Sequence, residues 1–162
     1  MPVHNHFLSA AGGTQPNPQA LAAAGAFLSM DVHVPPQVET ALTTVGQPVP
    51  SSVTGLALID TGATMTCVHE PILTNLGLQP VGTLSAGTAT GRAQQSVYMC
   101  RLIFPVLGWT VDLPVAGVNL DGQEIATSPP QPIIALLGRN LLQMCVLIWN
   151  GPGGFWTIAT SN

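Results

Sequence analysis

Charge is scarce in this chain of 162 residues, in which Asp, Glu, Lys and Arg together make up only 6%. There is no lysine, and the three basic residues are Arg92, Arg101 and Arg139. Proteins that bind nucleic acid neutralise its phosphates with clustered basic side chains, which a chain of net charge −4 does not provide. We therefore expect no nucleic-acid partner. Burying surface in an oligomer is one way for so uncharged a chain to remain soluble.

Long apolar runs and paired cysteines are also lacking. The longest apolar stretches, residues 133–137 and 144–149, are far shorter than the ~20 residues of a membrane-spanning helix. The N-terminus has no positively charged start of a secretory signal. Cys67, Cys100 and Cys145 contain no C-x-x-C pair for zinc and do not suggest a disulfide framework. We expect a cytoplasmic protein with no membrane partner, no metal and no cofactor.

Hydrophobic residues make up 46% of the chain, in short runs that favour strands. Glycines and prolines in residues 1–20 predict a flexible N-terminal arm, followed by a single domain over residues 21–162. The candidate strands are residues 27–34, 53–59, 81–88, 93–104, 109–118, 133–137, 145–149 and 155–159. The candidate helices are residues 71–76 and 139–144, with a helical turn at 38–44. Many short strands with one or two short helices predict a mostly β, closed domain.

The sequence around Asp60 places an acidic residue directly after an apolar strand. Residues 58–63 read Leu-Ile-Asp-Thr-Gly-Ala, so the strand end is anchored in the core and the carboxylate projects from a rigid element. Gly62 permits a tight turn and a close approach of backbone, and Thr61 offers a hydroxyl that can donate and accept. Taken alone, an Asp-Thr-Gly triplet is also typical of an ordinary turn.

Peptide hydrolysis without a metal needs a second acidic group beside Asp60. One group takes a proton from water while another gives a proton to the carbonyl oxygen, and two carboxylates about 3 Å apart do this by sharing one proton. The chain contains no second Asp-Thr-Gly, and Asp31, Asp112 and Asp121 stand in unrelated contexts. A catalytic role for Asp60 therefore requires a second chain, paired through a two-fold axis.

A second element further along the chain strengthens the catalytic interpretation. Residues 133–142 read Ile-Ile-Ala-Leu-Leu-Gly-Arg-Asn-Leu-Leu, which is an apolar strand, a glycine and a short helix. Together with residues 58–63, this segment resembles the two signatures of the retropepsin-like aspartic proteases, the single-domain relatives of retroviral proteases. The order and spacing agree over residues 25–160. The Asp-Thr-Gly-Ala run followed by Thr66 looks more like the cellular and bacterial members than the retroviral ones.

The resemblance implies a closed barrel of the retropepsin type that is active as a homodimer, and it implies roles for the residues that match the motifs. The implied catalytic residues are Asp60, Thr61 and Gly62. The implied substrate-binding residues are Ala63 and a flap turn formed by Thr88, Ala89, Thr90 and Gly91. The implied structural signature, which passes behind the catalytic loop, is Leu137, Gly138, Arg139 and Asn140.

One position departs from the family pattern. Retroviral members carry an acidic residue just after the Ala, and that acid pairs with the arginine that corresponds to Arg139. Here the position holds Thr64, so the partner of Arg139 is left open.

These observations favour an aspartic endopeptidase that hydrolyses peptide bonds through a water activated by two Asp60 carboxylates, one from each subunit. An alternative is a peptide- or protein-binding module of the same fold that cleaves weakly or not at all, which the scarce charge and Thr64 would suit. A third interpretation is a domain that serves mainly to dimerise. The terminal run 155–159 is expected to build the dimer sheet, because an unpaired apolar edge invites pairing.

Overall fold

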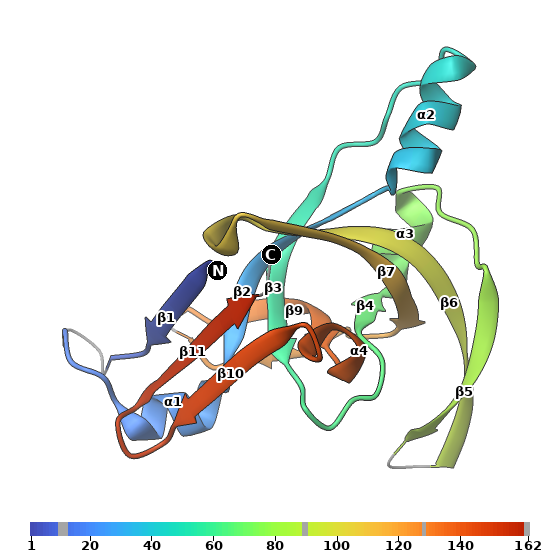
Figure 1. The fold of residues 1–162 in the computed structure, drawn as a ribbon. Coiled ribbons are helices and arrows are strands. Elements are labelled where there is room, and N and C mark those ends of the chain that lie inside the picture. Colours follow the sequence, from blue (N-terminus) through green and yellow to red (C-terminus); the bar gives the residue numbers. More distant parts are fainter. Residues whose placement is uncertain (10–12, 89–90, 128, 161–162) are drawn as a thin grey trace.

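The computed structural model describes residues 1–9, 13–88, 91–127 and 129–160, and most of them lie in strands (Figure 1). The strands are β1 (Val3–Phe7), β2 (Phe27–His33), β3 (Val53–Ile59), β4 (Cys67–His69), β5 (Gly82–Thr88), β6 (Gly91–Phe104), β7 (Trp109–Val118), β8 (Glu124–Ile125), β9 (Gln131–Leu137), β10 (Cys145–Asn150) and β11 (Phe155–Thr160). The helices are α1 (Pro18–Ala24), α2 (Pro36–Thr44), α3 (Glu70–Asn75) and α4 (Arg139–Leu142), with one 3₁₀ turn, η1 (Pro105–Leu107). All the strands expected from the sequence form, and β1, β4 and β8 are additions.

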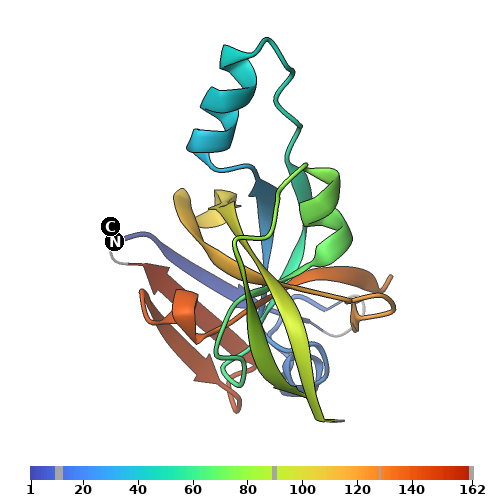
Figure 2. The same cartoon turned by 90° about the vertical axis from the view of Figure 1, so that its right-hand side faces the viewer.

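Six strands of the described chain close into a barrel. β2 pairs with β3, β3 with β9, β9 with β4, β4 with β7, β7 with β6, and β6 returns to β2. The β3–β9 and β4–β7 pairs are parallel, and the others in the ring are antiparallel. The mostly β, closed barrel expected from the sequence is therefore confirmed. β5 lies outside the ring and pairs with β6 as a long hairpin that projects from the barrel (Figure 2).

Strand periodicity explains how the barrel surrounds a core. Along β2, Leu28, Met30 and Val32 are buried and alternate with partly exposed residues, because successive side chains of a strand point to opposite faces. Phe104, at the end of β6, is fully buried and stacks on Trp109 with ring centroids 5.3 Å apart. β3 and β9 are supported by this apolar interior. The loop that begins at Asp60 therefore starts from a fixed strand end.

A second sheet lies beside the barrel, with β11 between β1 and β10. β1 runs antiparallel to β11, from Val3 opposite Ala159 to Phe7 opposite Phe155. Within residues 1–20, for which the sequence predicts a flexible arm, residues 3–7 form this strand, because β11 offers the backbone of β1 hydrogen-bond partners along one side. The helix α1 is a further addition, and the Asn17 side chain caps its start by accepting a backbone hydrogen bond.

The position of β11 also changes which strand has an open edge. Because β11 is paired on both sides, the terminal run 155–159 is not the edge of its sheet. Among the described strands of this sheet, β10 is an edge, and its Val146, Ile148 and Trp149 are 55%, 52% and 49% exposed.

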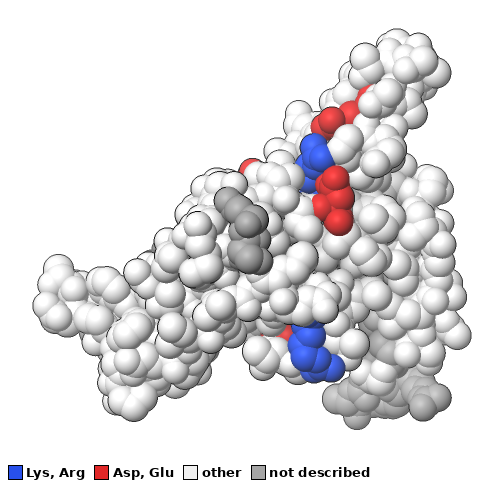
Figure 3. Space-filling view, in the orientation of Figure 1, with Lys and Arg blue, Asp and Glu red and all other residues white. Residues whose placement is uncertain are grey.

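The described residues contain four short helices, where the sequence suggested one or two. The helix α2 projects away from the barrel and buries none of its residues. A group of acidic and basic side chains lies at its base (Figure 3). His33 Nδ1 is 3.1 Å from Glu39 Oε1, and Arg101 Nε is 2.8 Å from Asp112 Oδ1. None of the helices in the described ranges is long and apolar enough to span a membrane.

Candidate active site

Asp60 begins the loop that follows β3, at the point where β3 and β9 end side by side. Ile59 lies opposite Leu137 in the parallel pair, and the Asp60 amide continues this pairing by donating to the Leu137 carbonyl at 3.0 Å. The carboxylate oxygen Oδ1 accepts from the amides of Gly62 at 2.9 Å and Ala63 at 3.2 Å. Hydrogen bonds to an ionised carboxylate are stronger than neutral ones, so the loop holds this half-buried group in a defined orientation.

Gly62 permits a close approach of the Asp60 side chain to the backbone of this loop. A Cβ atom at this position would lie 3.1 Å from Asp60 Oδ1, which is tighter than an ordinary van der Waals contact. The backbone of Gly62 is not in the left-handed region. The absence of a side chain at Gly62 therefore leaves room for the Asp60 carboxylate to accept from the loop amides. The backbone conformation of Gly62 does not itself call for glycine.

The second sequence signature packs directly behind the Asp60 loop. The Arg139 amide donates to the Ala63 carbonyl at 2.9 Å, and the Asn140 amide donates to the Thr64 carbonyl at 3.1 Å. Gly138 is buried against the loop, where an added Cβ would lie 2.4 Å from the Met65 carbonyl carbon. The two motifs predicted to meet are therefore in contact along several residues.

Arg139 finds its partners within the loop itself. Its Nη1 donates to the carbonyl oxygens of Thr61 at 2.8 Å and Gly62 at 3.0 Å. Its Nη2 donates to Thr64 Oγ1 at 2.8 Å. Thr64 stands where the retroviral members carry an acidic residue, and it accepts a hydrogen bond from Arg139 as that acid would. Thr64 and the two loop carbonyls are therefore the partners of Arg139 that the sequence left open.

Thr66 is a structural element of the site that sequence reasoning did not assign. It is fully buried, and its Oγ1 donates to Asn140 Oδ1 at 2.8 Å while accepting from the Gly138 amide at 3.1 Å. Asn140 Oδ1 also accepts from the Thr66 amide at 2.7 Å, and its Nδ2 donates to the Pro114 carbonyl at 3.1 Å. No local sequence signal marks Thr66, since the hydroxyl gains its partners only through the fold.

Replacing Thr66 with Val is expected to destabilise the protein by roughly 1–3 kcal/mol, because the buried Gly138 amide loses its acceptor. Val keeps the shape of Thr, so the change removes the hydroxyl without opening a cavity. The free energy of unfolding in urea measures the effect. Thr66→Ser is the matched control, since it keeps the hydroxyl, and a T66V variant as stable as T66S would contradict this role.

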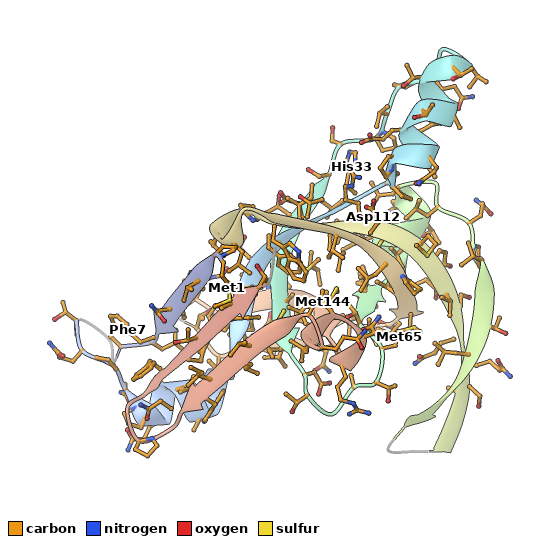
Figure 4. The ribbon with its side chains drawn as sticks, viewed as in Figure 1. Met1, Phe7, His33, Met65, Asp112 and Met144 are labelled. Carbon is orange, nitrogen blue, oxygen red and sulfur yellow. The ribbon has the colours of Figure 1, made fainter. Side chains whose placement is uncertain are left out.

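A cavity of about 490 Å³ lies between the Asp60 loop and the β5–β6 hairpin. Its described lining is Gly62, Ala63, Thr64, Met65, Cys67, Leu84, Ser85, Gly87, Gln95 and Ala116. Met65 lies between α4 and the strands β6 and β7 (Figure 4). The described lining contains no Asp, Glu, Lys or Arg, and two of its residues, Gly62 and Ala63, are the ones whose amides hold Asp60.

Cys67 forms part of this cavity wall. Burial, and in second place the negative charge of Asp60, raise the pKa of its thiol. The thiol is therefore neutral near neutral pH and acts as a small, weakly polar surface. It is half-buried.

The hairpin predicted to form the flap is present next to the cavity. Its strands stay in register to their ends, with Thr88 opposite Gly91. Two of the predicted flap residues, Ala89 and Thr90, lie outside the described residues. No group of three His, Cys, Asp or Glu side chains that could hold a metal ion occurs in the described part of the chain.

The barrel and the braced Asp60 loop match the class that the two motifs resemble, the retropepsin-like aspartic proteases. The chain is similar to the solution structure of a simian foamy virus protease, with 22% identity, 73% of this chain and 92% of that chain covered, and a TM-score of 0.43. It is also similar to the crystal structure of a retropepsin-like aspartic protease from Rickettsia conorii, with 13% identity, coverage of 96% and 90%, and a TM-score of 0.45. No protein-family model and no curated protein sequence matches the chain.

Proposed function

We propose that the protein is an aspartic endopeptidase that works as a homodimer, with one catalytic carboxylate from Asp60 of each subunit. The observation that carries the proposal is the orientation of this carboxylate. Its Oδ1 is held by the Gly62 and Ala63 amides beside the 490 Å³ cavity. Its Oδ2 makes no hydrogen bond within the described residues, which leaves that oxygen for a water molecule and a second carboxylate.

In the dimer, the two Asp60 carboxylates would share one proton, because like charges about 3 Å apart cannot both ionise. The ionised carboxylate takes a proton from water as the water oxygen attacks the scissile carbonyl carbon. The protonated carboxyl gives its proton to the carbonyl oxygen, which produces a tetrahedral diol. A proton then passes to the amide nitrogen as the C–N bond breaks. A lone subunit has half of these groups and would be inactive.

Residues around Asp60 would support binding of an extended peptide. Thr61 is exposed on the loop, where its hydroxyl could contact the loop of the partner. Ala63 and the inner side of the hairpin would contact the peptide, and the turn at residues 88–91 would close over it and exclude water. Because the described lining has no charged side chain, an uncharged peptide side chain would be accommodated at lower desolvation cost than a charged one.

The open edge of β10 would receive the second copy. β10 follows directly after α4, whose Arg139 binds the Asp60 loop. Its sequence, Cys-Val-Leu-Ile-Trp-Asn, contains no charge or proline, the features that usually protect an edge from pairing. Two β10 strands pairing about a two-fold axis would satisfy both edges at once.

Digestion of a peptide library with and without pepstatin tests the proposal against a module that only binds peptides. We expect specific cleavage that pepstatin blocks, at protein concentrations where sedimentation shows a dimer. A dimer that binds peptides and leaves them intact would favour the binding module. A stable monomer that cleaves would contradict the shared site.

A further inference from the structure

The strand β1 covers a buried tryptophan with two histidines. His4 and His6 alternate with outward-facing residues along β1, so their imidazoles lie on the same, inner face. The ring centroids of His4 and His6 are each 5.5 Å from that of Trp156, which is fully buried. His6 also contacts Phe27 of the barrel, with centroids 5.3 Å apart. The two imidazoles are thus part of the packing that holds β1 on β11.

Among the described residues, this packing offers no hydrogen-bond acceptor to His6 Nε2. His6 Nε2 is buried and has no hydrogen-bond partner among the described residues, and the same is true of Trp156 Nε1. Burial lowers the pKa of His4. Burial, followed by the charge of His4, lowers the pKa of His6. The docked strand therefore favours the neutral form of both rings.

The elements packed around β1 supply no compensating negative charge. Neither α1, η1 nor β11 contains an ionisable side chain. The ionisable residues of β2 are Asp31, which accepts from Thr54 Oγ1, and His33, which lies beside Glu39. A proton on His6 Nε2 would be both desolvated and unpaired, and a proton on His4 would meet no negative charge on these elements.

We propose that β1 is an acid-released cover, which detaches from β11 when His4 and His6 become protonated. The released strand would uncover Trp156 and one backbone edge of β11. Residues 3–7 pair with β11, the Thr160 amide donates to the Pro2 carbonyl at 3.2 Å, and the side-chain bond from Thr157 Oγ1 to Asn5 Oδ1 lies on the outer face. An opening of this size can occur locally, without unfolding the barrel. This inference concerns strand docking and does not depend on peptide cleavage.

The direction of the pH effect follows from the two lowered pKa values. In the released strand both histidines return to about 6.5, so the released form binds protons more readily than the docked form. The docking free energy is therefore fully present above about pH 6.5 and is lost as the pH falls through the docked pKa values.

Hydrogen exchange at about pH 5 and about pH 7.5, corrected for the intrinsic exchange rate, tests the proposal on the full chain. We expect peptides covering residues 1–9 and 155–160 to lose protection by roughly tenfold at the lower pH, while those of β3 and β9 keep theirs. Equal protection of β1 at the two pH values would overturn the proposal. Loss of protection in β3 and β9 together with β1 would also overturn it, since that indicates global unfolding.

A double variant, His4→Phe and His6→Phe, separates protonation from other effects of acid. Phenylalanine keeps a ring against Trp156 and cannot titrate, so residues 1–9 should stay protected at both pH values. His33→Gln, which changes a histidine at the base of α2, is the matched control and should respond as the unmodified chain does. If the double variant loses protection in acid to the same extent as the unmodified chain, the histidines are not the cause and the proposal fails.

Discussion

Replacement of Asp60 by Asn is expected to lower the rate of peptide cleavage by on the order of 10⁴-fold and to leave the dimer intact. The Asn side-chain oxygen can still accept from the amides of Gly62 and Ala63, as Oδ1 does at 2.9 and 3.2 Å. It cannot take a proton from water or carry the shared proton. Cleavage of a fluorescent peptide chosen from the library measures the rate, and sedimentation checks the dimer. Unchanged cleavage by the D60N variant would contradict the proposed mechanism.

Mixing the D60N variant with the unmodified chain tests whether the two carboxylates come from different subunits. After subunits exchange at equal concentrations, about half of the unmodified chains should sit in mixed dimers with one carboxylate, so activity should fall to about half. A larger excess of the variant should reduce the activity further. Full activity in the mixtures, after exchange has been shown with labelled subunits, would mean that each subunit acts alone.

Replacement of Gly138 by Ala is expected to destabilise the fold more than any surface change, by about 3 kcal/mol or more. The added Cβ would lie 2.4 Å from the Met65 carbonyl carbon, 2.5 Å from its oxygen and 2.7 Å from the Thr66 nitrogen. All three are backbone atoms, so no side-chain rotation can relieve the contact. The Asp60 loop or α4 must move instead, and cleavage should fall together with stability.

Thermal unfolding measures this effect, and we expect the Tm to drop by roughly 10 °C. Gly82→Ala is the matched control, because a Cβ at Gly82 meets no atom within 4 Å. That variant should keep its Tm to within a few degrees. If G138A and G82A unfold at similar temperatures, the close packing of Gly138 against the loop does not constrain the protein.

The barrel and the meeting of the two motifs could be predicted because their signals are local in the sequence. Strand periodicity marks β2, and the apolar run 133–137 marks β9 as a strand. The resemblance to the retropepsin-like aspartic proteases, carried by the order of strand, glycine and helix, then implied that residues 138–140 would pass behind the Asp60 loop. The structure places Arg139 and Asn140 there, with amides 2.9 and 3.1 Å from loop carbonyls.

Other features depended on contacts that no local pattern encodes. β1 contains two histidines and an asparagine, which carry no strand signal, and it forms because β11 presents a matching edge. Thr66 is one of many threonines in the chain and acquires its role from Asn140, 74 residues away. The partners of Arg139 are two carbonyl oxygens and a hydroxyl, which composition and spacing cannot identify.

The long separation between Asp60 and its brace has a consequence for when the protein can act. The Asp60 amide needs the Leu137 carbonyl, and the next residues of the loop need Arg139 and Asn140. Contacts between residues so far apart form only after a large loop of chain has closed, which is a slow step in folding. A chain still emerging from the ribosome carries the aspartate long before it carries the segment that positions it. Under the proposed function, a chain that has not yet reached residues 137–140 would have no positioned Asp60 and would not cleave itself or its neighbours.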